Sequence, residues 1–446
     1  MMGGLGSIGK VPELKQRVLF TLLMLAIYRL GVFVSTPGID VKALRSLFEA
    51  NSGTIFDLVN MFSGGSLENF SIFTLGIMPY ISVSIIMQFL TPVVPALAAL
   101  KKEGAAGQRV LTRYTRIFTV GLAIFQSYVI ATGLESQGLV LNPGMEFKVL
   151  TVCTLTAGTA FIMWLGEQIT ERGIGNGMSM IIFAGIIARM PSVFVQTLQL
   201  AQTGEVQPHE ILLVLIFCAF TIVGIVYVER CFRKVPVQYP RRMVGKNIAQ
   251  AQTQYLPLKL NMAGVIPPIF ASAFLVLPAT ITQFSGSQVL KDYMAWFQSD
   301  SLVYNLIFVA LIIVFSYYYT AVVYDPNEVA ENLKKGGGFV PTVRPGKPTA
   351  DYLYGILNRL TFWGSIYIAI VCVVPQLVYA EVGMASFGYI FGGTAVLIAV
   401  SVTLDTASQI ESYVLSHNYE AFLNKAQKSG RSSVTLRQAR ARMLKR

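Results

Sequence analysis

The stretch EILLVLIFCAFTIVGIVYV, residues 210–228, decides what kind of protein this is. After its first residue it carries no charge over nearly the ~20 residues that a helix, rising about 1.5 Å per residue, needs to cross about 30 Å of hydrocarbon. Nine further stretches of this kind lie near 18–36, 74–95, 114–133, 151–170, 178–196, 262–281, 302–324, 360–379 and 389–410. The sequence therefore predicts an all-α polytopic membrane protein with ten transmembrane helices.

Lys and Arg gather in every second loop between these stretches. The segment before the first stretch, the loops 101–116, 171–177, 229–260 and 331–359 and the tail after 424 together hold 29 of the 35. Cytoplasmic loops of membrane proteins carry an excess of Lys and Arg. Both termini are therefore expected on the cytoplasmic side.

Composition excludes most other classes of protein. The chain is 54% hydrophobic and 13% charged, far from the roughly 25% charged residues of a soluble domain. The net charge of +12 lies in the loops beside the spans, so its first explanation is topology, with anionic lipid or a cytoplasmic partner second. No metal-binding spacing of Cys or His, nucleotide motif or catalytic triad is visible, so neither an enzyme nor a cofactor is expected.

The chain divides most naturally at the polar stretch 197–209, which is expected to form an external hinge loop. It leaves five spans in an N-terminal half, 1–196, and five in a C-terminal half, 210–424, before a basic tail at 425–446. Two related halves with an odd number of spans each are inverted in the membrane, and their interface then contains the transport pathway.

Three features do not fit plain membrane spans. The polar, glycine-bearing stretch inside 55–90 is either a surface loop with an interfacial helix or a re-entrant element in an aqueous cavity. The turn Gly173–Gly177 has three alternating glycines, which allow two helices to approach closely. The basic loops 229–260 and 325–359 are longer than a connection needs, which makes them candidates for docking a large partner.

Two other classes of function stay open on these patterns. A secondary transporter with inverted repeats would explain the topology, but Glu167 and Asp405, the carboxylates inside the spans, lie toward the cytoplasmic ends and not at the midplane where ion coupling needs them. A receptor or scaffold would explain the basic loops but not the polar stretch in 55–90.

Five long strings carry a resemblance to a known family. They are NMFSGGSLENFSIFTLGIMPYISVSII (60–86), WLGEQITERGIGNG (164–177), LPLKLNMAGVIPPIFAS (256–272), NLKKGGGFVPTVRPG (332–346) and FGGT (391–394). The chain resembles the SecY family, the channel subunits of bacterial protein translocases, from about residue 10 to 425.

The resemblance implies two inverted five-helix halves around a central pore, which passes unfolded secretory polypeptides and releases transmembrane segments sideways. A ring of aliphatic side chains at the waist corresponds to Ile77, Ile81, Met178, Ile182, Ile269 and Ile398. A short re-entrant plug helix corresponds to about 60–73, with Asn60, Ser63, Gly64, Gly65, Glu68 and Phe70. Ile85 is expected to face lipid.

The resemblance also implies a lateral gate and a docking surface. Gln88 and Asn261 match polar positions of the gate, where an amide pair would be worth about 1 kcal/mol. The docking surface for the SecA motor and the ribosome corresponds to Arg344, with Arg241, Arg242, Lys246, Lys334 and Lys335. Further implied partners are SecE and SecG in a heterotrimer, signal sequences, unfolded preproteins and membrane lipids, at the bacterial inner membrane.

Overall fold

All ten predicted spans are helices in the structure, a computed structural model. It describes residues 11–40, 43–44, 60, 63–203, 207–239, 243–244, 247–248, 252–284, 301–381 and 391–428. The ten are α2 (Pro12–Val32), α5 (Met78–Val93), α7 (Ala105–Ser136), α8 (Met145–Arg172), α9 (Gly177–Thr203), α10 (Pro208–Glu229), α11 (Ile266–Phe284), α13 (Leu302–Val323), α15 (Lys347–Glu381) and α17 (Gly393–Lys428). By length and composition, seven of the described helices could cross a membrane, or up to eight if α5 and α6 (Pro95–Lys102), bent by 94°, form one span.

Local sequence signals set where several helices begin. Proline, which has no N–H to leave unpaired, occupies the first turn of α2, α5, α6, α10 and the short α14 (Pro326–Lys335). Gln207 and Glu210 form a capping box at the start of α10. The side chains of Ser301 and Asp325 accept backbone N–H groups at the starts of α13 and α14. These signals explain why the helices begin close to the first residues of the apolar stretches.

The helices alternate in direction as ten spans require. At one end of the molecule, the start of α2, the turn between α8 and α9, and the middle of α17 form a small apolar cluster that includes Leu14, Ile174 and Val414. At the other end, the chain after α2 pairs with the loop between α7 and α8 through an antiparallel bridge of Ile39 with Val140. The described helices therefore run between two opposite surfaces. The basic loops lie at the surface that holds the cluster of Leu14, Ile174 and Val414.

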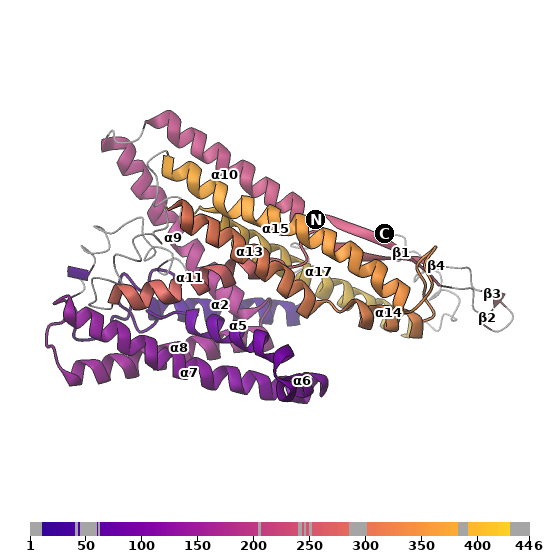
Figure 1. Ribbon diagram of the computed structural model, residues 1–446, viewed down its shortest axis with the longest axis horizontal. Coiled ribbons are helices and arrows are strands. Elements are labelled where there is room, and N and C mark those ends of the chain that lie inside the picture. Colours follow the sequence, from indigo (N-terminus) through magenta and orange to yellow (C-terminus); the bar gives the residue numbers. More distant parts are fainter. Residues whose placement is uncertain are drawn as a thin grey trace.

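The largest apolar core lies where the two halves meet. It combines side chains of α2, α5, α8 and α9 from the N-terminal half with side chains of α11, α13, α15 and α17 from the C-terminal half. In Figure 1, α7 and α8 lie along one side of the molecule and α10 and α15 along the other, with α2, α5, α11 and α17 between them. The interface between the halves is therefore the centre of the fold.

The structure departs from the predicted boundaries in two places. Helix α9 continues through Thr203, so the polar stretch 197–209 is partly helical and the hinge loop is shorter than predicted. The all-α prediction misses a hairpin in the basic loop 229–260: strands β1 (Phe232–Tyr239) and β4 (Gln252–Lys259) are antiparallel, and β2 (Met243–Val244) pairs with β3 (Asn247–Ile248) at its tip. Alternate residues of β1, Val235 and Val237, are buried, as a half-buried strand requires.

The two long basic loops form one unit. Gln238 of β1 exchanges backbone hydrogen bonds with Phe339, at 2.8 and 2.9 Å, in the loop between α14 and α15. Beneath this bridge, Val235 and Leu258 of the hairpin pack with Val340 and with Ile356 and Leu360 of α15. The hairpin, α14 and the following loop extend from one end of the helical bundle, as Figure 1 shows.

Candidate functional site

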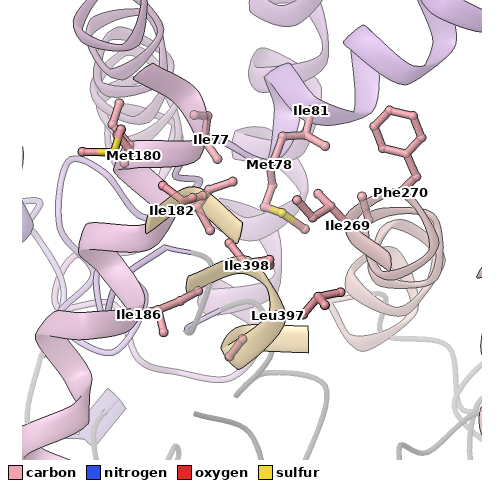
Figure 2. Close-up of a cluster of buried hydrophobic side chains, with 14 of the residues drawn as sticks. Ile77, Met78, Ile81, Met180, Ile182, Ile186, Ile269, Phe270, Leu397 and Ile398 are labelled. Carbon is pink, nitrogen blue, oxygen red and sulfur yellow. The ribbon is translucent and has the colours of Figure 1, made fainter. Parts of the chain in front are cut away.

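Apolar side chains from four helices converge at the centre of the interface between the halves. Ile77 precedes α5 and Ile81 lies in its first turn, while Ile182, Ile269 and Ile398 come from α9, α11 and α17. All five are buried in the central core, and Figure 2 shows them pointing toward a common centre. The structure thus brings together five of the six predicted ring residues, three from the N-terminal half and two from the C-terminal half.

Met178, the sixth predicted ring residue, lies against α8, and Ile186 lies one turn beyond Ile182 on α9. The Met178 sulfur lies where a Cβ on Gly166 of α8 would come within 2.5 Å of it, so this side chain fills the space between α8 and α9. Ile186 is fully buried and lies beside Ile398 and Leu397 in Figure 2. Because Ile182 and Ile186 are four residues apart, they share one face of α9. Met178 is partly buried and packs against the same core, so its place in the ring stays a prediction, and Ile186 is a further candidate from α9.

The prediction that Ile85 faces lipid is wrong. Ile77, Ile81 and Ile85 are spaced by four residues, so they lie on one face of the chain at α5. Ile85 is buried in the central core, whereas the next residue, Ile86, is 50% exposed. Ile86 is therefore the residue of this turn that faces outward.

The polar segment 63–76, together with Asn60, lies inside the protein. Ser63, Ser66 and Phe70 are fully buried, and Asn60 nearly so. A short helix was predicted over about 60–73; among the described residues of this range, Asn60 is helical, whereas 63–70 and 72–73 are turns. Gly64 and Gly65 have positive φ angles of 67° and 87°, which favour glycine and end any regular helix. We refer to Asn60 and 63–76 below as the plug segment.

The plug segment satisfies most of its own polar groups. The Ser66 hydroxyl lies 2.7 Å from both the Ser63 and the Phe73 carbonyl oxygens, and the Thr74 hydroxyl donates to the Ser71 carbonyl at 2.6 Å. The Asn60 side-chain oxygen accepts the Glu68 backbone N–H at 3.3 Å. Serine and threonine hydroxyls that bind nearby carbonyls favour turns over helix. Polar sequence and burial are compatible here because the segment folds onto itself.

Three side chains of the surrounding helices complete the polar contacts of the plug segment. From α2, the Tyr28 hydroxyl donates to the Ser63 carbonyl at 3.1 Å and the Arg29 guanidinium to the Gly64 carbonyl at 2.7 Å. From α9, Arg189 lies 3.4 Å from the Glu68 carboxylate. Sequence reasoning assigned no role to Arg29 or Arg189. The signal for both was available, because a charged residue inside a span needs a partner.

The plug segment also touches α9 through bare backbone. A Cβ on Gly185 would lie 3.1 Å from the Gly64 Cα, and a Cβ on Gly64 would lie 2.9 Å from the Gly185 Cα. Gly185 lies on α9 between Ile182 and Ile186 of the apolar ring. The plug segment is therefore seated directly beside the ring.

Beyond Glu68, the plug segment is anchored by Phe70. This side chain is fully buried in a second apolar cluster, with Ala123, Ile130 and Leu155 of α7 and α8. The Phe70 carbonyl accepts the Thr36 N–H at 2.8 Å, and its own φ is positive at 39°. Phe70 thus fixes the segment to the N-terminal half.

The predicted amide pair of Gln88 with Asn261 does not form. The Asn261 amide nitrogen donates to the Glu229 carboxylate at 2.7 Å, and its oxygen accepts the Gly264 N–H at 3.0 Å. Asn261 therefore joins the end of α10 to the turn before α11, both in the C-terminal half. The Gln88 side chain donates to the Ser84 hydroxyl at 3.4 Å, within α5. A local partner is available to each amide, so neither side chain reaches across the interface.

The contact between α5 and α13 is aromatic. Phe89 of α5 stacks on Tyr318 of α13 with ring centroids 3.9 Å apart, and its edge meets Phe315 at 5.7 Å. Phe270 and Phe274 of α11 surround Phe315 from the other side. The Tyr318 hydroxyl donates to the Gln88 backbone carbonyl at 2.8 Å. We call this contact between α5 and the pair α11 and α13 the aromatic seam.

The predicted docking residues lie on the unit formed by the two long loops, as far as the structure describes them. Arg344 is exposed in the loop after α14, where its carbonyl accepts the Thr349 hydroxyl at 2.8 Å. Lys334 and Lys335 are exposed in the last turn of α14, and Lys335 pairs with Glu331 at 3.0 Å. Arg241, Arg242 and Lys246 lie outside the described residues.

The two carboxylates that a transporter could have used are engaged in ion pairs. Glu167 of α8 pairs with Arg116 of α7 at 2.7 Å. Asp405 of α17 lies 3.5 Å from Lys259 of β4, and both side chains are about half exposed or more, at 66% and 49%. These contacts join neighbouring elements near the surface that carries the basic loops.

Comparison with known proteins agrees with this geometry. The SecY family model matches residues 71–407. The chain is 46% identical to the protein translocase subunit SecY of Escherichia coli strain K12, over 96% of each chain. Its fold is similar to that of a SecY protein whose plug domain stabilises the closed state of the translocation channel, with a TM-score of 0.64 at 16% identity over 90% and 93% of the two chains. It is also similar to Sec61 in the canine ribosome-channel complex, with a TM-score of 0.63 at 15% identity over 90% and 93%. At these identities the two structural likenesses establish the fold, and the sequence match establishes the relationship: the chain belongs to the SecY family of protein translocase subunits.

Proposed function

We propose that this chain is the channel subunit of a bacterial protein translocase, which passes unfolded polypeptides through the interface between its halves. The family match is to channel subunits, so the chain is a transport protein and not an enzyme. The observation that carries the proposal is the apolar ring of Ile77, Ile81, Ile182, Ile269 and Ile398, to which both halves contribute, beside a buried polar segment. We add Ile186 to this ring on the geometry of α9.

The ring supplies the seal. A narrow apolar constriction expels water and so blocks hydrated ions. The side chains that form it are aliphatic and come from separate helices, so they can part around a polypeptide and still contact it on all sides. A ring of polar side chains would hold water and could not exclude ions during transport.

The plug segment blocks the same path from one side. Its first part has polar contacts with the surrounding helices: the carbonyls of Ser63 and Gly64 accept from Tyr28 and Arg29, and Glu68 lies beside Arg189. Water can replace each of these partners once it reaches the segment. This part of the plug segment can therefore leave its seat, whereas Phe70 and Phe73, both buried among apolar side chains, keep the rest attached to the N-terminal half.

The aromatic seam is our candidate for a lateral gate. It lies between α5 of one half and α11 and α13 of the other, next to the ring residues Ile81 and Ile269. Aromatic pairs are worth about 0.5–1.5 kcal/mol each beyond area burial, which is small enough for an apolar helix to compete with them. Gln88 contributes to this seam through its backbone, while Asn261 braces α11 from behind.

The unit of the two long loops is our candidate for partner docking. Its exposed cations, Arg344, Lys334 and Lys335, lie on ordered structure supported by the apolar cluster around Val235 and Val340. We infer that it binds a SecA motor and the ribosome, and the relative in the canine ribosome-channel complex supports the second. Small helical subunits resembling SecE and SecG would clamp the two halves from outside. The excess of Lys and Arg in these loops supports a cytoplasmic location for this surface and for both termini, at a bacterial inner membrane.

Ion flux through the reconstituted protein tests the proposal. Deletion of residues 62–72 removes most of the plug segment but none of the ring. A channel should then leak ions at rest while still exporting protein, whereas a carrier should lose transport and a scaffold should show neither effect. A deletion variant with the same resting conductance as the intact chain, at matched amounts in the bilayer, would contradict a plugged channel.

A further inference from the structure

A proline deprives the aromatic seam of one backbone hydrogen bond. Pro92 lies inside α5, in its last turn. In a helix, the N–H of each residue binds the carbonyl four residues earlier, and proline has no N–H. The carbonyl left without a helical partner by Pro92 is that of Gln88. An unpaired carbonyl at this depth costs free energy, since hydrocarbon offers it no donor.

The missing partner comes from the opposite half of the protein. The Tyr318 hydroxyl of α13 donates to the Gln88 carbonyl at 2.8 Å. Its ring lies flat on Phe89, the next residue of α5, at 3.9 Å and an angle of 16°. One side chain therefore satisfies the freed carbonyl and covers the residue beside it.

We propose that Tyr318 is the residue that sets how easily the aromatic seam opens, through its bond to the carbonyl that Pro92 frees. This inference rests on the proposed role of the seam as a lateral gate. When α5 and α13 part, the Gln88 carbonyl loses its donor and its own helix cannot replace it. The closed seam is thus favoured by one hydrogen bond that a proline-free α5 would not need. An entering apolar helix has to compensate that loss, so the bond sets the minimum hydrophobicity of an accepted signal segment.

Two substitutions act on this bond from opposite sides. Tyr318→Phe removes the hydroxyl and retains the ring that stacks on Phe89. Pro92→Ala returns an N–H to α5, which can bind the Gln88 carbonyl whether the seam is open or closed. Each should favour the open seam, and each should do so through the same carbonyl. The bend between α5 and α6 lies beyond Pro92, at the extended residue Val94, so Pro92→Ala leaves its cause in place.

The test compares export of reporters whose signal segments carry a graded number of leucines, in vesicles with the purified translocase. Tyr318→Phe should raise export with the weakest segments about two- to tenfold, the range that one hydrogen bond of this kind is worth. Export with the strongest segments should not change. Pro92→Ala should give a similar rise, and the double variant should be no more permissive than either single one. Tyr317→Phe is the matched control, because Tyr317 is the adjacent residue of α13 and is 37% exposed. It should behave as wild type.

The non-additivity separates this inference from a general loosening of the seam. Additive effects of Tyr318→Phe and Pro92→Ala would show that the hydroxyl and the proline act independently, and the proposal would fall. The proposal would also fall if both single variants exported weak segments no better than wild type, in vesicles where wild type exports strong segments. Absence of export with every segment, wild type included, would instead overturn the proposed function and this inference with it. If Tyr318→Phe lowers the melting temperature of the complex, the export of weak segments by Pro92→Ala alone decides the proposal. That variant adds a backbone hydrogen bond to α5 and removes no side-chain contact of Tyr318.

Discussion

Widening α9 at Gly185 should displace the plug segment. A side chain at this position would meet the backbone of Gly64, since the first added carbon already lies 3.1 Å from the Gly64 Cα and 3.3 Å from its nitrogen. Backbone cannot swing aside as a flexible side chain can. Tyr28 and Arg29 also hold this part of the segment, by their bonds to the carbonyls of Ser63 and Gly64. Gly185→Val therefore places two further methyl groups against a fixed wall.

The expected magnitude follows from the cost of overpacking. Extra methyl groups in a close-packed site cost about 1–3 kcal/mol. The cost applies only while the segment is seated, because an unseated segment leaves the space empty. At tenfold per ~1.4 kcal/mol, the ratio of unseated to seated molecules should rise about 5- to 150-fold.

Single-channel recording in planar bilayers measures this ratio as the fraction of time that the resting channel conducts. Gly121→Val is the matched control, because Gly121 also lies on a helix, in α7, and has open space where its Cβ would be. Both variants introduce the same β-branched residue, so their helix propensities change equally. Equal open fractions for Gly185→Val, Gly121→Val and wild type would refute the close contact between Gly185 and Gly64.

Three further predictions follow from the same geometry. Serine at both Ile182 and Ile186 should raise resting conductance, because hydroxyls retain water in the constriction, whereas serine at the outward-facing Ile86 should not; bilayer recording of the three proteins decides. Arg189→Met should raise the resting open fraction about two- to tenfold at low salt and less at high salt. The reason is that Glu68, the carboxylate partner of Arg189 on the plug segment, is partly exposed, so salt screens the pair. An effect independent of salt would argue against the ion pair. Arg344→Glu should block motor-driven export in membrane vesicles, while the free energy of unfolding stays within about 0.5 kcal/mol of wild type. Arg344→Lys should retain part of the export. Full export by Arg344→Glu would remove this residue from the docking surface.

The spans could be predicted from sequence because one physical variable decides them. A segment such as 210–228 is stable in hydrocarbon only as a helix that satisfies its own backbone, and the limits of α10 differ from the predicted ones by a few residues at most. The hairpin of β1 and β4 escaped prediction because its described buried residues are few: Val235 and Val237 in β1, and Leu258 in β4. So short an alternation is common by chance in a basic loop.

Helix rotation is the part of the site that the sequence left undetermined. Met178, Ile182 and Ile186 share one face of α9, so their spacing cannot tell which pair reaches the centre. In the structure Ile182 and Ile186 are buried and Met178 is partly buried against Gly166 of α8, and that contact depends on the close approach of two helices at the glycine turn. The same limit explains Gln88 and Asn261: both lie near the seam, but the first uses its backbone and the second binds Glu229.

The closed state combines two kinds of contact that respond differently to water. Around the ring every contact is apolar, so the ring closes whenever nothing fills it. The plug segment adds hydrogen bonds from Tyr28 and Arg29 to its carbonyls, and water can replace these donors once a polypeptide has opened the path. The seam combines both kinds, the aromatic contacts around Phe89 and Phe315 and the hydrogen bond to the Gln88 carbonyl. As the proposed lateral gate it would open toward lipid, where no water replaces the lost donor, so we expect this step of opening to depend most on the apolar character of the entering segment.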